Sequence, residues 1–162
     1  MNVSPLRYEV IKRTGKHPLQ DVLVRIHITD TNDPTHSLFI EGPLGMELSY
    51  LMHSFIALYN EHEDEFLLPT NRQPVRITRL PNGLEFHVLD EAFDTATWQV
   101  SGPITLDHRT FLSGLSALVE EVLSSIDEAF AEDDFVHILV YQWEQLWQLA
   151  SRLMTGRVIA LP

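Results

Sequence analysis

Cysteine is absent from this 162-residue chain. Its absence excludes disulfide bonds, thiolate zinc sites and cysteine nucleophiles together. No stretch approaches the roughly 20 consecutive apolar residues of a membrane-spanning helix, and the first 16 residues lack the apolar core of a secretory signal peptide. We therefore expect a soluble, cytoplasmic protein with no membrane partner and no cofactor.

Lysine is scarce, and charge is distributed unevenly along the chain. The sequence has 11 basic and 23 acidic residues, a net charge of −12. Residues 1–29 contain both lysines, Lys12 and Lys16, and carry a net charge of +3, whereas residues 30–162 carry −15. Such an acidic chain repels phosphate backbones, so nucleic acid is not an expected ligand. A basic protein partner, or solubility alone, accounts for the charge.

Motifs of the common enzyme classes are missing. The sequence has no P-loop, no G-x-G-x-x-G, no G-x-S-x-G and no H-E-x-x-H. Among eight histidines, no pair has ligand spacing on one helix face. His27 and His87 are predicted on strands and could meet on one sheet face, which would suit a metal-dependent enzyme. A polar sheet face explains them equally well, so we assign no catalytic, cofactor-binding or metal-binding residue.

The stretch "DTNDPTHSLFIE" is similar to an EF-hand calcium loop at three positions. Asp30, Asn32 and Glu41 match loop positions 1, 3 and 12. Pro34 offers no side-chain oxygen at position 5, and Thr35 replaces the glycine required at position 6. A strand, not a helix, precedes the loop. The stretch is therefore predicted to connect two strands, with its acidic and amide side chains bonding to their own backbone.

Apolar periodicity predicts the secondary structure. Alternation indicates strands at 7–13, 22–29 and 37–43, a hairpin over 75–90 that turns at Pro81-Asn82-Gly83, and a strand at 97–106. Asn-Gly is expected to supply the positive φ of that turn. Helical spacing predicts helices at about 46–61, from 107 or 110 to about 130, and at 134–154. The proline-containing segment 64–74 is predicted to be a loop.

The order of these elements predicts an α+β fold. Three strands and a helix occur twice, each helix preceded by Gly-Pro, and an extra helix follows. This βββα-βββα-α order favours an antiparallel meander sheet with helices packed on one face. At this length we expect one globular domain spanning 1–162. It would contain two halves, at about 1–65 and 72–131, if the repetition is a true duplication.

Acidic residues gather near the ends of two predicted helices. The longer predicted helix, 107–130, would place Glu121, Glu128 and Glu132 on one face. Negative charge at a helix C-terminus is disfavoured by the macrodipole, by roughly 0.3–1 kcal/mol for each close position, which suggests that the charge is retained to bind a basic partner. The run "NEHEDE", at residues 60–65, places acids at the end of the other predicted helix. We interpret this run as a solvated helix end in preference to a metal site. The candidate partner-binding residues are Glu120, Glu121, Asp127, Glu128, Glu132, Glu61, Glu63 and Asp64.

The last predicted helix offers a different candidate contact. Its first turns are apolar nearly all round, and Trp143 and Trp147 lie one turn apart. Such a helix is either buried centrally or shared with a second copy of the chain in a homodimer.

Three functions follow from these observations. The first is a non-enzymatic protein-binding module that captures a basic partner. Small, acidic, cysteine-free bacterial α+β proteins include the immunity proteins that neutralise toxins, although no motif here carries that comparison. The alternatives are a homo-oligomeric structural or regulatory subunit and a metal-dependent enzyme.

Overall fold

The strands form two antiparallel sheets. A computed structural model describes residues 5–60, 63–69, 74–89 and 103–154. The first sheet contains β1 (Leu6–Arg13), β2 (Val22–Thr29) and β3 (Ser37–Pro43) in that order. The second contains β4 (Glu65–Leu68), β5 (Val75–Leu80), β6 (Gly83–Val88) and β7 (Ile104–Asp107). Each strand pairs with its neighbour in the sequence, so both sheets are meanders.

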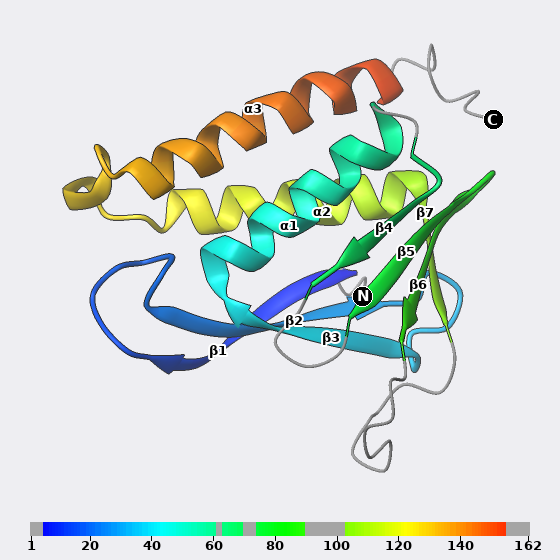
Figure 1. The fold of residues 1–162 in the computed structure, drawn as a ribbon, viewed down its shortest axis with the longest axis horizontal. Helices are drawn as coiled ribbons and strands as arrows, with labels where there is room; N and C mark the ends of the chain where they lie inside the picture. Colours follow the sequence, from blue (N-terminus) through cyan, green and yellow to red (C-terminus); the bar gives the residue numbers. More distant parts are fainter. Residues whose placement is uncertain (1–4, 61–62, 70–73, 90–102, 155–162) are drawn as a thin grey trace.

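Three helices form a layer against the sheets. These are α1 (Leu44–Tyr59), α2 (His108–Ser124) and α3 (Asp134–Met154). In Figure 1 all three lie on one side of the first sheet, and the second sheet closes one end of the helical layer. The predicted α+β class, with antiparallel meanders and helices on one face, is confirmed. The two groups of strands, which the sequence could not assign to one sheet or two, form separate sheets.

Two predicted boundaries are wrong for identifiable reasons. Part of the predicted loop 64–74 forms β4, which lies along α1 and pairs with β5. The predicted helix to about residue 130 ends at Ser124, because the hydroxyls of Ser124 and Ser125 bond to the carbonyls of Glu121 and Val122. These local bonds compete with continuation of the helix. A short 3₁₀ helix follows at Glu128–Phe130.

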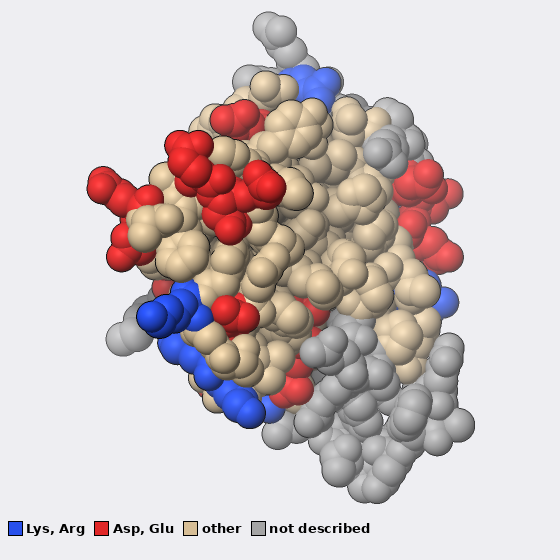
Figure 2. All heavy atoms as spheres, turned by 60° about the vertical axis from the view of Figure 1, so that its left-hand side comes forward, with Lys and Arg blue, Asp and Glu red and all other residues tan. Residues whose placement is uncertain are grey.

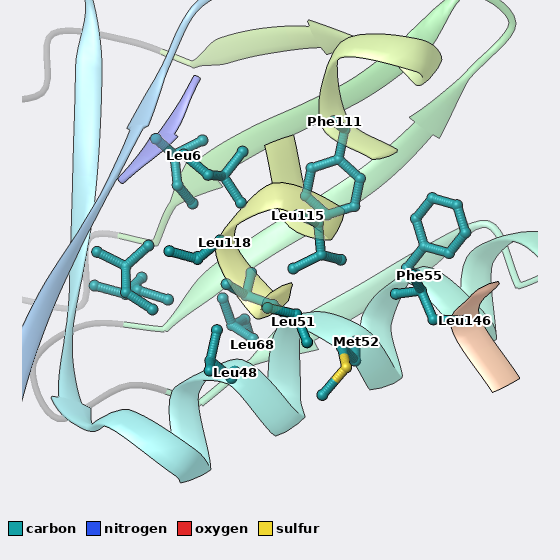
Figure 3. Close-up of a cluster of buried hydrophobic side chains, with 14 of the residues drawn as sticks. Leu6, Leu48, Leu51, Met52, Phe55, Leu68, Phe111, Leu115, Leu118 and Leu146 are labelled. Atoms are coloured by element: carbon teal, nitrogen blue, oxygen red, sulfur yellow. The ribbon is translucent and has the colours of Figure 1, made fainter. Parts of the chain in front are cut away.

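One hydrophobic cluster is shared by both sheets and the helices. Alternate residues of β2 (Val22, Val24, Ile26 and Ile28) point inward as predicted, and so do Ile77, Leu84 and Phe86 of the second sheet. Figure 3 shows Leu48, Leu51 and Phe55 of α1 facing Phe111, Leu115 and Leu118 of α2. Phe111 also packs against Phe86, with ring centroids 5.7 Å apart. Burial of these side chains supplies the main stabilisation of the fold.

The acidic stretch that begins at Asp30 connects the two sheets. Asp30 Oδ1 accepts hydrogen bonds from the backbone N–H groups of Asn32 and Asp33, at 2.7 and 3.1 Å. Its Oδ2 accepts one from the N–H of Thr105 in β7, at 2.8 Å. The carbonyl of Thr105 accepts in turn from the N–H of Thr31. Both carboxylate oxygens of Asp30 therefore accept hydrogen bonds from backbone N–H groups. The sequence predicted the bonds within the loop but not the bond to Thr105.

Gly45 and Gly83 each permit a close approach between separate elements of the fold. At Gly45 a Cβ would lie 2.5 Å from the Phe135 ring and 2.8 Å from Leu19 Cβ, so this residue lets the β1–β2 connection, α1 and α3 meet. At Gly83, which follows the β5–β6 turn, a Cβ would collide with the backbone of Leu106. The φ angle of Gly83 is not in the left-handed region, so this glycine is needed for the approach of β7 and not for a positive φ.

Candidate functional site

The predicted acidic residues are divided between two ends of the helical layer. Glu120 and Glu121 lie in α2, and the acids from residue 127 to 134 lie in the connection from α2 to α3. Glu63 and Asp64 lie between α1 and β4, at the other end of the helical layer (Figure 1). Glu61 lies outside the described residues. These candidates therefore form two separate surfaces, and the larger one is at the α2–α3 connection.

Two acids of the connection stabilise local structure. Asp127 caps the 3₁₀ helix by accepting from the N–H of Ala129, at 2.9 Å. Asp133 Oδ1 accepts from the first N–H groups of α3, those of Phe135 and Val136, at 2.9 and 3.1 Å. Both are favourable helix caps. Asp127 is therefore a weaker candidate for partner binding than the sequence predicted.

The remaining acids of this end are exposed. Glu120, Glu121, Glu128, Glu132 and Asp134 are all solvent-exposed, and in the described part of the chain none of them forms an ion pair. Because α2 ends at Ser124, Glu128 and Glu132 do not share a helix face with Glu121, and that prediction is wrong. Glu128 and Glu132 lie instead in the connection that follows the helix. We name Glu120, Glu121, Glu128, Glu132 and Asp134 the acidic end.

A basic hairpin lies beside the acidic end. Lys12 and Arg13 are exposed at the end of β1, and Lys16 is exposed in the β1–β2 connection. This connection and the α2–α3 connection occupy the same end of the molecule in Figure 1, and Figure 2 shows adjacent groups of acidic and basic side chains on that side. The charge asymmetry of the sequence thus becomes a surface with both signs side by side.

His17 joins the two connections. Its Nδ1 accepts hydrogen bonds from the N–H groups of Leu19 and Gln20, at 3.1 and 3.0 Å, so the ring proton is on Nε2. Nε2 lies 3.0 Å from Asp133 Oδ2, although the two groups are not aligned as a linear hydrogen bond. The pKa of the Asp133 carboxyl is lowered, mainly by the contact with His17 and to a smaller extent by the hydrogen bonds from the N–H groups of Val136 and Phe135. The hairpin is therefore fixed against the start of α3.

The tryptophan pair of α3 is half in the core and half at the surface. Trp143 is partly buried and packs against the hydrophobic cluster. Trp147 is 54% exposed, and its ring centroid lies 5.7 Å from that of Trp143. Ile138 and Tyr141 of the same helix are also exposed. The apolar first turns of α3 are therefore only partly buried.

The two strand histidines do not form a shared site. His27 lies in β2 and His87 in β6, so they belong to different sheets and the predicted common sheet face does not exist. His27 Nε2 lies 3.1 Å from Glu9 Oε1 on the outer face of the first sheet. Over the described ranges, no group of three or more histidine and acidic side chains is arranged to hold a metal ion.

Two polar groups in the interior escaped prediction. Glu47, in the first turn of α1, is only 1% exposed, and its Oε2 has no hydrogen-bond partner. Burial raises the pKa of this carboxyl to about 8, so it is mostly neutral at pH 7. The only signal in the sequence is that Glu47 is the one charged residue of an otherwise uncharged helix.

A second polar group lies where α1 ends. The buried Tyr59 hydroxyl donates to Nδ1 of His108, whose Nε2 then donates to the Pro81 carbonyl at 3.2 Å. Burial raises the pKa of Tyr59 far above its ordinary value. Beside it, Arg79, with a side chain 5% exposed, donates to the carbonyl of Leu58 at 2.6 Å. The phenol stays protonated and the histidine bonds to a backbone carbonyl. The pair is therefore better suited to stabilising the fold than to transferring protons in a reaction.

Comparisons with protein-family models, with curated protein sequences and with solved structures gave no match to this chain. Among the described residues, no helix combines the length and the apolar character needed to cross a bilayer. The features available for inferring function are therefore the acidic end, the basic hairpin beside it and the exposed face of α3.

Proposed function

We propose that this protein is a non-enzymatic binding module that captures a basic protein partner through the acidic end. The observation that carries the proposal is that five exposed acids gather where α2 ends and α3 begins, without ion pairs among the described residues. A group of acids that form no ion pairs repel one another in the folded chain and accelerate encounter with a partner of opposite sign.

The neighbouring structure supports a defined orientation of the partner. Asp127 and Asp133 anchor the α2–α3 connection by capping, and His17 fixes it to the basic hairpin. A partner whose surface carries basic and acidic groups side by side would match both the acidic end and the hairpin. Charge complementarity of this kind sets specificity and association rate more than affinity.

A bacterial immunity-type inhibitor or an adaptor is the specific form of this function that we propose, in the cytoplasm. The small size, net charge of −12 and lack of cysteine support it. Such an inhibitor would neutralise a basic toxin domain by covering its functional surface.

The test is an affinity capture from the native cell with the whole protein immobilised and bound proteins eluted in a salt gradient. We expect one basic protein, released by salt and identified by mass spectrometry. Glu128→Gln combined with Glu132→Gln should lower its retention. The matched control removes two charges at the other end of the helical layer, by Glu63→Gln and Glu65→Gln, and should leave retention unchanged. Equal retention by the two double variants would show that only net charge matters.

A homo-oligomeric subunit is the second candidate, favoured by the exposure of Trp147, Ile138 and Tyr141 on α3. Light scattering over a range of concentrations separates it from the first. A stable dimer that Trp147→Ala dissociates would support it, and a monomer at all concentrations would exclude it.

A further inference from the structure

A groove runs between α2 and α3. Its volume is about 610 Å³, and it is lined by Ser113, Ser116, Ala117 and Glu120 of α2 and by Trp147 and Ala150 of α3, among others. The α2 positions recur every three to four residues and so follow one side of that helix for about two turns. The hollow has two causes. The side chains on its floor are small, and α3 packs more extensively on α1 than on α2.

One wall of the groove is an ordered aromatic side chain. Trp147 is exposed at the rim, yet its ring lies against Trp143, which packs on the core. A tryptophan held in this way loses little conformational freedom when a partner covers it. Tryptophans of this kind dominate the energetics of protein interfaces.

The charge along the groove has a single sign. Glu120 is the only charged residue among those that line it. Outside the lining, Glu144 is exposed one turn before Trp147 on α3. Between Arg109 and Arg152 neither helix contains a lysine or an arginine. The groove therefore combines an apolar floor with one acidic side chain, that of Glu120.

We infer that the groove binds an amphipathic basic helix of the partner. This inference rests on the proposed function and names the partner's chemistry. An apolar side chain of the partner enters the hollow over Ala117 and Ala150. An arginine or lysine beside it pairs with Glu120 and lies over the face of Trp147, combining an ion pair with a cation–π contact. Helices recognise grooves between helices in this manner, with anchors spaced three to four residues apart.

Charge also decides between this occupant and a second copy of the chain. A second copy of the chain carries the same net charge of −12 and would bring like charge to the groove that contains Glu120. Like charges brought together oppose association. A basic partner gains from the same charges.

The test uses a fluorescent helical peptide of leucine and lysine with its leucines on one face. A peptide of the same composition in scrambled order is the comparison, and anisotropy gives both affinities at near-physiological salt. We expect the amphipathic peptide to bind more tightly. Trp147→Ala and Ala117→Tyr, which fills the hollow, should each weaken binding by about tenfold. Tyr141→Ala is an exposed control outside the lining and should change it little.

The outcomes separate this inference from the proposed function. Equal binding of the two peptides, or unchanged affinity in Trp147→Ala and Ala117→Tyr, would overturn the groove as the docking site. If the Glu128→Gln and Glu132→Gln pair still lowered capture of the native partner, the proposed function would stand without the groove. A dimer dissociated by Ala117→Tyr would assign the groove to a second copy and overturn the inference.

Discussion

The Asp30 carboxylate and the backbone N–H of Thr105 are joined by a hydrogen bond of 2.8 Å, although the two residues are 75 positions apart. Through this bond the β2–β3 connection of the first sheet is tied to β7, the last strand of the second. The stretch that is similar to a calcium loop in sequence thus acts as a bridge between sheets.

Asp30→Ala should destabilise the protein through this bridge. Three backbone N–H groups, those of Asn32, Asp33 and Thr105, lose their acceptor, and we expect the free energy of unfolding to fall by about 1–3 kcal/mol. Urea unfolding measures the change. Asp33→Ala is the control, because its side chain bonds only within the exposed loop. An equal loss in both variants would contradict the bridging role.

Glu47 should make stability fall as pH rises. Its pKa is about 8 in the folded protein against an ordinary 4.5, so between these values the folded state holds a proton that the unfolded state releases. Its contribution is fully present below 4.5 and is lost as pH rises through about 8, with a slope of at most about 1.4 kcal/mol per pH unit.

Glu47→Gln should flatten this dependence, as measured by urea unfolding at several pH values. Glu47→Leu should also raise stability at pH 8, because it removes the unpartnered buried oxygen. Glu128→Gln is the exposed control. A wild-type stability that rises from pH 5 to 8, with no change in the Glu47→Gln profile, would refute the assignment.

Gly45→Ala should disrupt the junction of hairpin, α1 and α3. The added methyl group would lie 2.5 Å from the Phe135 ring and 2.8 Å from Leu19 Cβ. Overpacking of this kind costs roughly 1–3 kcal/mol. Thermal unfolding should show recovery in the double variant with Phe135→Leu, which frees space. Ser49→Ala in the same helix is the control. Lack of coupling between positions 45 and 135 would argue against the close approach.

Asp133 should contribute to stability only at pH values at which its carboxyl group is charged. Its pKa is lowered from 3.8 in the folded protein, so the contribution is present above 3.8 and is lost as pH falls through the folded value. Acid unfolding followed by circular dichroism should therefore be less steep in Asp133→Asn. Asp134→Asn removes the same charge one residue later and should keep the wild-type profile. If both variants behaved alike, the contacts of Asp133 would not be the cause.

Much of the fold was predictable because its signals are local. The alternation in 22–29 and the helical spacing from Leu48 to Tyr59 depend on residues a few positions apart, and burial follows directly from them. The end of α2 was missed although its cause is also local. The apolar Ile126 and Phe130 continue the helical period, whereas the hydroxyls of Ser124 and Ser125 end the helix.

For the candidate site, the sequence predicted which charged residues occur near one another in the chain but not how they are arranged in space. The sequence showed that acids gather near residues 120–134, but Asp133 is engaged by His17 from a hairpin more than a hundred residues earlier. The groove beside Trp147 likewise depends on where α3 packs relative to α1 and α2. No pattern of neighbouring residues encodes such a separation between helices.

The sequence by itself determined the α+β class, most of the strands and helices and the acidic character, because each arises from periodicity or composition. Only the tertiary structure decided the division into two sheets, the burial of Glu47, the separation of His27 from His87 and the two distinct acidic surfaces. The physical reason is the range of the interactions. Secondary structure responds to neighbours within a few residues, whereas desolvation, bridging hydrogen bonds and surface charge depend on segments that only folding brings together.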